Sequence, residues 1–115
     1  LSTDRDDPRA RAAFRRGEWN RYRIVCVGKL LRTWVNDVPV AHVEDDWSPR
    51  GFLGLQVHSV EGDPRWRVAW RAIRLREIGD GGGFASLFDG RTLQGWRVNE
   101  NPASVRVEDG AIVVR

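Results

Sequence analysis

Short runs of β-branched and aromatic residues, separated by turn-forming pairs, are the feature that most constrains how this chain can fold. The runs cover residues 19–27, 30–36, 38–43, 51–60 and 66–78. The first three are joined by Gly28-Lys29 and by Asn36-Asp37, both typical of tight turns. Short strands with a turn every 8–12 residues, about the spacing seen here, are typical of antiparallel sandwiches and barrels rather than parallel α/β sheets. The sequence therefore predicts an all-β, antiparallel β-sandwich.

Two positions predict irregularities within these strands. Pro39 cannot donate to a sheet ladder, so its strand either begins there or lies at an edge. In the last run, Trp66, Val68 and Trp70 alternate cleanly onto one face, and the alternation then slips. The slip predicts a bulge or bend near Arg71-Ala72.

The chain divides into four segments. Residues 1–16 are expected to be irregular, a loop or a short helical turn, and residues 17–78 hold the strands described above. Residues 79–83 form a glycine-rich linker. Residues 84–115 begin afresh and end in a hairpin around Asp109-Gly110. Leu1 in place of an initiator Met, and a last strand that stops at the final residue, suggest that both ends are cut.

Composition narrows the classes of function. A chain of 115 residues can hold one modest domain. Its 19 Lys and Arg and 16 Asp and Glu are interleaved without a basic stripe or a nucleic-acid-binding motif, so nucleic acid is not expected as a partner. The sequence contains no run of about 18 apolar residues, so no membrane-spanning helix is expected. The single Cys26 has no partner for an internal disulfide and is expected to be buried in its strand.

Two pairs of segments resemble the 3-keto-disaccharide hydrolase family, whose fold is a concanavalin-like jelly roll. Residues 17–25 (GEWNRYRIV) and 33–40 (TWVNDVPV) resemble a hairpin of that family. Residues 51–58 (GFLGLQVH) and 70–78 (WRAIRLREI) resemble its closing strands. Asp37 stands where Gly is usual in the family, and Ala72 stands where Asn is usual.

Residues 84–115 resemble the opening of such a domain instead, through FASLFDGRTLQGW and the strand pair that follows. The chain is therefore expected to carry the back half of one jelly-roll copy and then the front of another, truncated or resembling a circular permutation. The second segment could complete the first, with residues 79–83 as the new connection. That closure requires ladder pairing between 84–115 and 17–78. The alternative is a second domain that has been cut short.

His58 is the first candidate for chemistry. Along 55–58, Leu55 and Val57 are expected to face the sandwich interior, which places Gln56 and His58 on the opposite, sugar-facing side. A histidine there could act as a general acid or base, or bind a divalent metal, and a structural histidine is the alternative. Gln56 is expected to contact substrate.

Aromatic and amide side chains supply the candidate sugar contacts. Asn20 and Tyr22 are expected to share a face, with Trp34 opposite them on the neighbouring strand. Aromatic planes stack on sugar CH faces, and amides pair with hydroxyls. Trp47, in a polar loop, is the candidate ligand-facing tryptophan, although most of the six Trp are expected to pack.

Glu18 and Arg71 match the family's Glu and Arg, which implies roles in catalysis and in holding a substrate oxygen. The alternative for Glu18 is a structural ion pair with Arg71 or Arg21. The acidic loops at 45–46 and 61–63 could bind a hard cation or serve as solvated surface. No Ser-His-Asp spacing, phosphate loop or Cys/His zinc cluster is visible, so a serine-hydrolase mechanism is not expected.

The resemblance implies activity on 3-keto glycosides, by elimination of the aglycone and hydration of the product. Such a reaction needs a base, an acid and a group that stabilises an enediolate, for which a divalent metal is a candidate cofactor. Two alternatives remain open: a non-catalytic carbohydrate-binding module, and an inactive fragment that completes its sandwich by self-association. Members of the family are typically exported.

Overall fold

The computed structural model describes residues 2–3, 7–45, 51–56, 67–79, 81–99 and 102–114. The chain forms two compact units, Leu1–Gly54 and Leu55–Arg115. Both are built from antiparallel β-strands, and the described residues include one short α-helix. The predicted all-β, antiparallel class is therefore confirmed, while the jelly-roll topology stays a prediction. No helix in the described ranges is long and apolar enough to cross a membrane.

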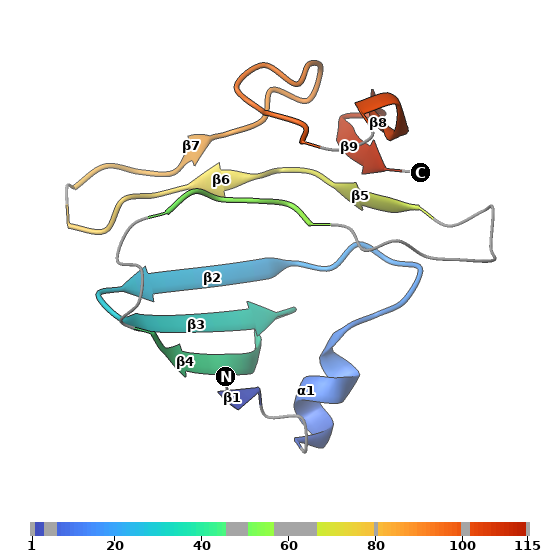
Figure 1. The fold of residues 1–115 in the computed structure, drawn as a ribbon. Coiled ribbons are helices and arrows are strands. Elements are labelled where there is room, and N and C mark those ends of the chain that lie inside the picture. The colour runs from blue at the N-terminus through green and yellow to red at the C-terminus, as the bar shows by residue number, and fades with distance from the viewer. Residues whose placement is uncertain are drawn as a thin grey trace. The chain divides into compact units, whose positions relative to one another are not determined.

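The first unit is a four-stranded antiparallel sheet in the order β1-β4-β3-β2 (Figure 1). Its strands are β1 (Ser2–Thr3), β2 (Tyr22–Val27), β3 (Leu30–Val35) and β4 (Val38–Glu44). The predicted meander from β2 to β4 is thus present. Pro39 is the second residue of β4, where a missing backbone donor is tolerated, and β1 covers the far side of β4 at Ala41 and His42.

The two turns of this sheet follow from their sequences. Gly28 adopts a φ of 57° between β2 and β3. Asn36 and Asp37 join β3 to β4 with φ values of 50° and 67°, the two positive values of a type I′ turn. Asn tolerates this left-handed conformation well, whereas at Asp37 a glycine would adopt it with less strain. A register shift between Thr33 and Trp34 bends the β3–β4 ladder.

The helix α1 (Pro8–Ala13) precedes the sheet, within the segment expected to be a loop or a short helical turn. Pro8 starts the helix, where its missing N–H costs nothing. The side chain of Asp7 caps the helix by accepting a hydrogen bond of 2.9 Å from the backbone N–H of Arg9. Ala13, at the other end, is buried.

The second unit contains a three-stranded sheet and a two-stranded one (Figure 1). Its elements are β5 (Val68–Trp70), β6 (Arg74–Leu75), β7 (Ala85–Ser86), the 3₁₀ helix η1 (Pro102–Ser104), β8 (Val105–Glu108) and β9 (Ala111–Val114). The predicted hairpin at Asp109-Gly110 is confirmed, with both residues at positive φ. Among the described residues of this unit, the buried side chains are those of Phe88 and of the β9 residues Ala111, Ile112 and Val113.

Two ladders cross the glycine-rich linker. β5 pairs with β9, and β6 pairs with β7, both antiparallel. The N–H of Leu87 extends the second ladder by donating to the carbonyl oxygen of Ile73 at 2.9 Å. This is the pairing that closure of 84–115 onto the preceding strands requires. The assignment of 84–115 to a second or permuted jelly-roll copy stays a prediction.

Three expectations need correction or refinement. The strand predicted over 51–60 is absent from its described part: residues 51–56 form no strand, and Phe52 is 94% exposed. The alternation expected along 55–58 therefore has no strand pairing at Leu55 and Gln56. The run over 66–78 is broken at 71–73, close to the predicted bend, because Ala72 adopts a φ of 53°. Cys26 is exposed rather than buried, and it lies on β2, the edge strand of the sheet, which has a neighbouring strand on one side only.

Candidate functional site

One face of the β2–β3 hairpin carries a groove with an unusual lining. Strand alternation and the β2–β3 register place six side chains together there. We call this the Trp34 groove; it is lined by Arg23, Val25, Val27, Leu30, Arg32 and Trp34 and has a volume of about 440 Å³. It is open to solvent, and its lining combines an apolar floor with two guanidinium groups.

Arg23 and Trp34 are directly paired across the two strands. The guanidinium carbon of Arg23 lies 5.0 Å from the centroid of the Trp34 ring, within the range of a cation–π contact. This contact holds the Arg23 guanidinium against the Trp34 ring at the end of the groove where the two residues pair.

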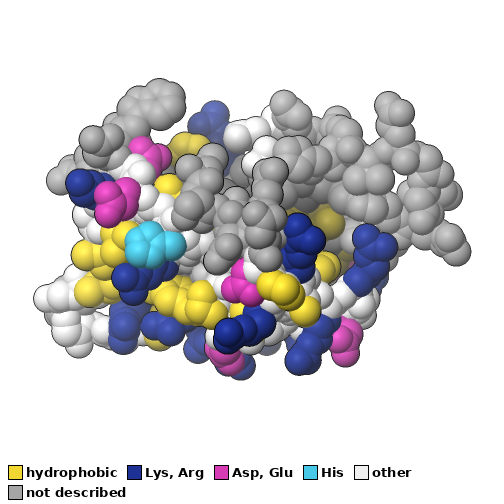
Figure 2. Space-filling view, turned by 90° about the horizontal axis from the view of Figure 1, so that it is seen from below, with side chains coloured by type: hydrophobic (Ala, Val, Ile, Leu, Met, Phe, Trp, Pro, Cys, Tyr) yellow, Lys and Arg dark blue, Asp and Glu magenta, His cyan; other side chains and the backbone are white. Residues whose placement is uncertain are grey.

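A second, smaller hollow of about 310 Å³ adjoins the first on the β4 side. Its lining residues are Arg32, Thr33, Trp34, Pro39, Ala41 and His42. Arg32 and Trp34 therefore line both hollows, and His42 is the direct cross-strand partner of Arg32. Figure 2 shows one side of the molecule, on which hydrophobic and basic side chains lie next to one another with acidic ones among them.

Asn20, a predicted sugar contact, is engaged within the chain instead. Its Oδ1 accepts hydrogen bonds from the N–H of Arg15 at 2.8 Å and from Nδ2 of Asn36 at 2.8 Å. Its Nδ2 donates to the carbonyl oxygens of Arg15 at 2.9 Å and of Glu18 at 3.0 Å. An amide offers two donors and two acceptor positions, so all four are used here.

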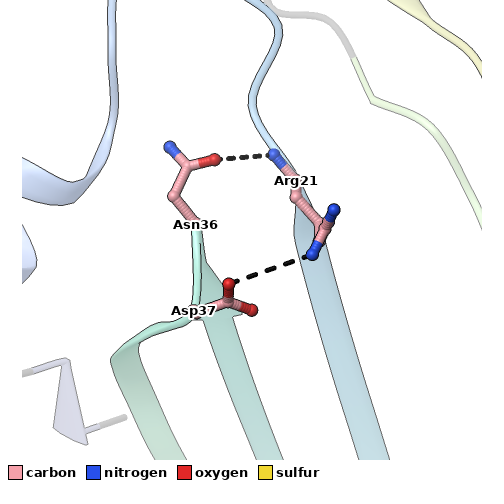
Figure 3. Close-up of polar contacts among 3 residues, drawn as sticks. All are labelled: Arg21, Asn36 and Asp37. Carbon is pink, nitrogen blue, oxygen red and sulfur yellow. Dashed lines mark hydrogen bonds and ion pairs between the residues drawn. The ribbon is translucent and has the colours of Figure 1, made fainter.

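Asn36 completes this network from the β3–β4 turn. Its Oδ1 accepts from the N–H of Arg21 at 2.9 Å, and its Nδ2 donates to the carbonyl oxygen of Ala13 at 2.7 Å as well as to Asn20. Figure 3 shows Asn36 and Arg21 in this contact, with the carboxylate of Asp37 3.9 Å from the Arg21 guanidinium. Arg21 thus forms an ion pair with Asp37, whereas Arg21 and Arg71 were the two alternative partners expected for Glu18.

The other predicted residues of the first unit are Glu18 and Tyr22. Glu18 is exposed, and its carbonyl oxygen is held by Asn20. Tyr22 is 61% exposed and pairs with Val35, whereas Trp34 pairs with Arg23. Tyr22 and Trp34 consequently point to opposite faces of the sheet, so the expected shared sugar-facing side does not include both.

The remaining predicted residues do not form a described cluster. Gln56 and Arg71 are exposed, the first in a segment without strand structure and the second between β5 and β6. His58 and Trp47 lie outside the described residues. Within the described ranges, no group of three or more His, Cys, Asp and Glu side chains could hold a metal ion.

Sequence reasoning missed Arg23, Arg32 and His42 as members of one face. The signal was available, because residues at alternate positions of a strand share a side. Arg23, Val25 and Val27 alternate along β2, as do Leu30, Arg32 and Trp34 along β3, and the two-residue turn fixes which of them meet. The bulge between Thr33 and Trp34 could not be predicted from this alternation, and it sets which β3 residue lies opposite His42.

Comparison with known proteins shows which family the chain belongs to. Residues 2–76, about two thirds of the chain, match the 3-keto-alpha-glucoside-1,2-lyase-like domain. Neither the curated proteins nor the solved structures contain a match. The matched region contains the whole described sheet of the first unit together with β5 and β6. The chain therefore belongs to the family of 3-keto-alpha-glucoside-1,2-lyase-like domains.

Proposed function

We propose that this chain acts on 3-keto glycosides and cleaves their glycosidic bond by elimination followed by hydration. The observation that carries the proposal is the family match over residues 2–76. The Trp34 groove supports it, because an aromatic ring beside charged donors on an apolar floor suits part of a glycoside.

The chemistry follows from the ketone at carbon 3. That carbonyl makes the proton on carbon 2 acidic, so a general base can remove it and leave the negative charge on the carbonyl oxygen. The bond between carbon 1 and the glycosidic oxygen then breaks, and the aglycone leaves with the electron pair and takes up a proton. Water adds to carbon 1 of the enone, so one water is consumed for each bond cleaved.

Each step of this reaction needs a group from the chain. We assign the base to His58, either directly or as the ligand of a divalent metal, and the positioning of the substrate oxygens to Arg71 and Gln56. A divalent metal, when bound, would stabilise the enediolate charge. Glu18 is assigned to proton transfer near the leaving oxygen.

Two further residues shape the site in this proposal. Trp47 is assigned to a contact with the sugar ring. Tyr22 points to the face of the sheet opposite Trp34, so it is not assigned to a ligand of the Trp34 groove. Asn20 acts by holding the loop that carries Glu18 and enters β2, because its amide is already bonded within the chain.

A non-catalytic carbohydrate-binding module is the second candidate. It is favoured by the lining of the Trp34 groove, because none of its six residues is a carboxylate or histidine that could serve there as a general acid or base. Jelly-roll folds host lectins as well as enzymes, so the fold does not decide between them.

A release assay separates the two candidates. The full chain is incubated with a 3-keto glucoside carrying a chromogenic aglycone, with and without added divalent metal. Release that disappears in His58→Ala and falls in Arg71→Gln, but persists in Arg106→Gln on the exposed side of β8, supports the enzyme. Saturable sugar binding without release supports the binding module. If folded protein neither releases the aglycone nor binds the sugar, both candidate functions are contradicted.

A further inference from the structure

We propose that the Trp34 groove binds the aglycone rather than the sugar, and that it selects a flat aromatic aglycone carrying a carboxylate, which Arg32 binds. This inference deepens the proposed function and rests on it, because only a glycoside substrate has an aglycone. The recognition of an aromatic carboxylate by the groove is tested independently of any turnover.

The first argument is the hydrogen-bonding inventory of the lining. Arg23, Arg32 and Trp34 carry the polar side-chain atoms of the groove, and every one of those atoms is a donor. The other three lining residues, Val25, Val27 and Leu30, are aliphatic. A sugar ring presents hydroxyls that each donate as well as accept, and the lining offers no side-chain acceptor for them. A carboxylate only accepts, so it matches this lining.

The second argument is the arrangement of the floor. Val27 and Leu30 are direct cross-strand partners, as are Val25 and Arg32. The aliphatic pair therefore lies one alternate position along from Arg32, on the same face. A flat ring resting on Val27 and Leu30 would bring a substituent on its edge toward the Arg32 guanidinium.

The third argument distinguishes the two arginines. Arg23 is held against the Trp34 ring at 5.0 Å. Arg32 is exposed and has no ion pair or hydrogen bond from its side chain among the residues the structure describes. Its direct cross-strand partners on this face are Val25 and His42, neither of which is an acid. Glu44, the cross-strand partner of Leu30, lies on the same face, but among the described residues it forms no ion pair with Arg32. An arginine fork matches a carboxylate in a two-bonded geometry, which makes Arg32 the anion-binding group.

Isothermal titration calorimetry with two ligands of the same shape tests the inference. The probes are 4-hydroxybenzoate and its neutral isostere 4-hydroxybenzamide. We expect wild-type protein to bind the benzoate at least about tenfold more tightly, because a charge-assisted bond to arginine is stronger than a neutral one. In Arg32→Gln the benzoate should fall to the affinity of the benzamide. Arg74→Gln is the matched control, because Arg74 stacks on Phe84 in the second unit at 5.3 Å.

Equal binding of the two probes by wild-type protein, or a preference for benzoate that survives in Arg32→Gln, overturns the inference. Arg32 is exposed, so its replacement leaves the fold intact, which far-ultraviolet circular dichroism checks. Failure here is distinguishable from failure of the proposed function. Cleavage of neutral 3-keto aryl glucosides without a charge preference overturns only the carboxylate selection, and charge-selective binding without cleavage overturns only the catalytic proposal.

Discussion

Nδ2 of Asn36 donates a hydrogen bond of 2.8 Å to Oδ1 of Asn20, which lies 16 residues earlier in the chain. Through its other bonds Asn20 holds the loop from Arg15 to Glu18, and Asn36 reaches the carbonyl oxygen of Ala13 at the end of α1. The pair therefore fastens the helix and the loop before β2 to the β3–β4 turn. This gives a physical reason for an Asn at each of the two positions.

Replacing either member of the pair should destabilise the first unit. Asn20→Ala and Asn36→Gly each remove several part-buried or loop hydrogen bonds, so we expect a loss of about 2–3 kcal/mol in the free energy of unfolding. Gly is chosen at position 36 because the φ of 50° stays accessible to it. Urea denaturation measures the change.

The double variant completes a mutant cycle. Because the two side chains bond to each other, the double change should cost at least about 1 kcal/mol less than the sum of the single changes. Asn99→Ala, at an exposed position, is the control and should be close to neutral. Strict additivity of the two single effects would show that the Asn20–Asn36 bond contributes nothing.

Ala72→Asn should stabilise the second unit. Ala72 adopts a φ of 53°, where a Cβ is strained and where Asn is better tolerated than Ala. We expect a gain of about 0.5–1 kcal/mol, measured as a raised midpoint of thermal or urea unfolding. Ala103→Asn in η1, where φ is not positive, is the control. A loss of stability in Ala72→Asn would contradict the left-handed conformation.

The sheet of the first unit was largely predictable because turn chemistry and strand alternation act locally. Gly28-Lys29 and Asn36-Asp37 set the register of β2, β3 and β4, and the alternation then fixes the two faces. The hairpin at Asp109-Gly110 was found for the same reason. Ala72 could be flagged only as a slip in parity, since its φ depends on the pairing on either side of it.

Burial and the site were less predictable, because they depend on contacts between segments. Cys26 has apolar neighbours along the chain, as a core residue would, yet it lies on the edge strand β2 and is exposed. Asn20 looked like a sugar contact, and only the fold shows that Asn36 and the loop use up its amide. Residues 51–56 have strand composition but no partner strand among the described residues.

Asp89 should make the stability of the second unit depend on pH at the acid end. Hydrogen bonds from the N–H of Thr92, from its hydroxyl and from the N–H of Arg91 lower the pKa of Asp89 from 3.8 to about 2. A carboxyl whose pKa is depressed by folding contributes stability that is fully present above about pH 4 and is lost as the pH falls toward 2.

Comparison of wild-type protein with Asp89→Asn checks this. The wild type should be the more stable of the two at pH 5, and the difference should shrink as the pH falls from 4 to 2. An NMR titration of the Asp89 carboxyl should give a pKa of about 2. A difference in stability that is constant across this range would contradict the account.

Cys26 should react with a thiol reagent in the native state. The side chain is exposed on β2, so the rate with 5,5′-dithiobis(2-nitrobenzoate) should approach that of the same protein in urea. One thiol per chain should be titrated, since Cys26 is the single cysteine. Reaction only after denaturation would show that this side of β2 is covered in solution.

The most direct test of the central claim is a comparison of a chromogenic 3-keto glucoside with its unoxidised parent glucoside, at equal concentration, with the same preparation of the chain. Elimination depends on the carbonyl at carbon 3, so the account predicts aglycone release from the 3-keto substrate and none above background from the parent. Equal release from both substrates would contradict elimination, and release from neither by folded protein, with divalent metal present, would contradict the proposed activity itself.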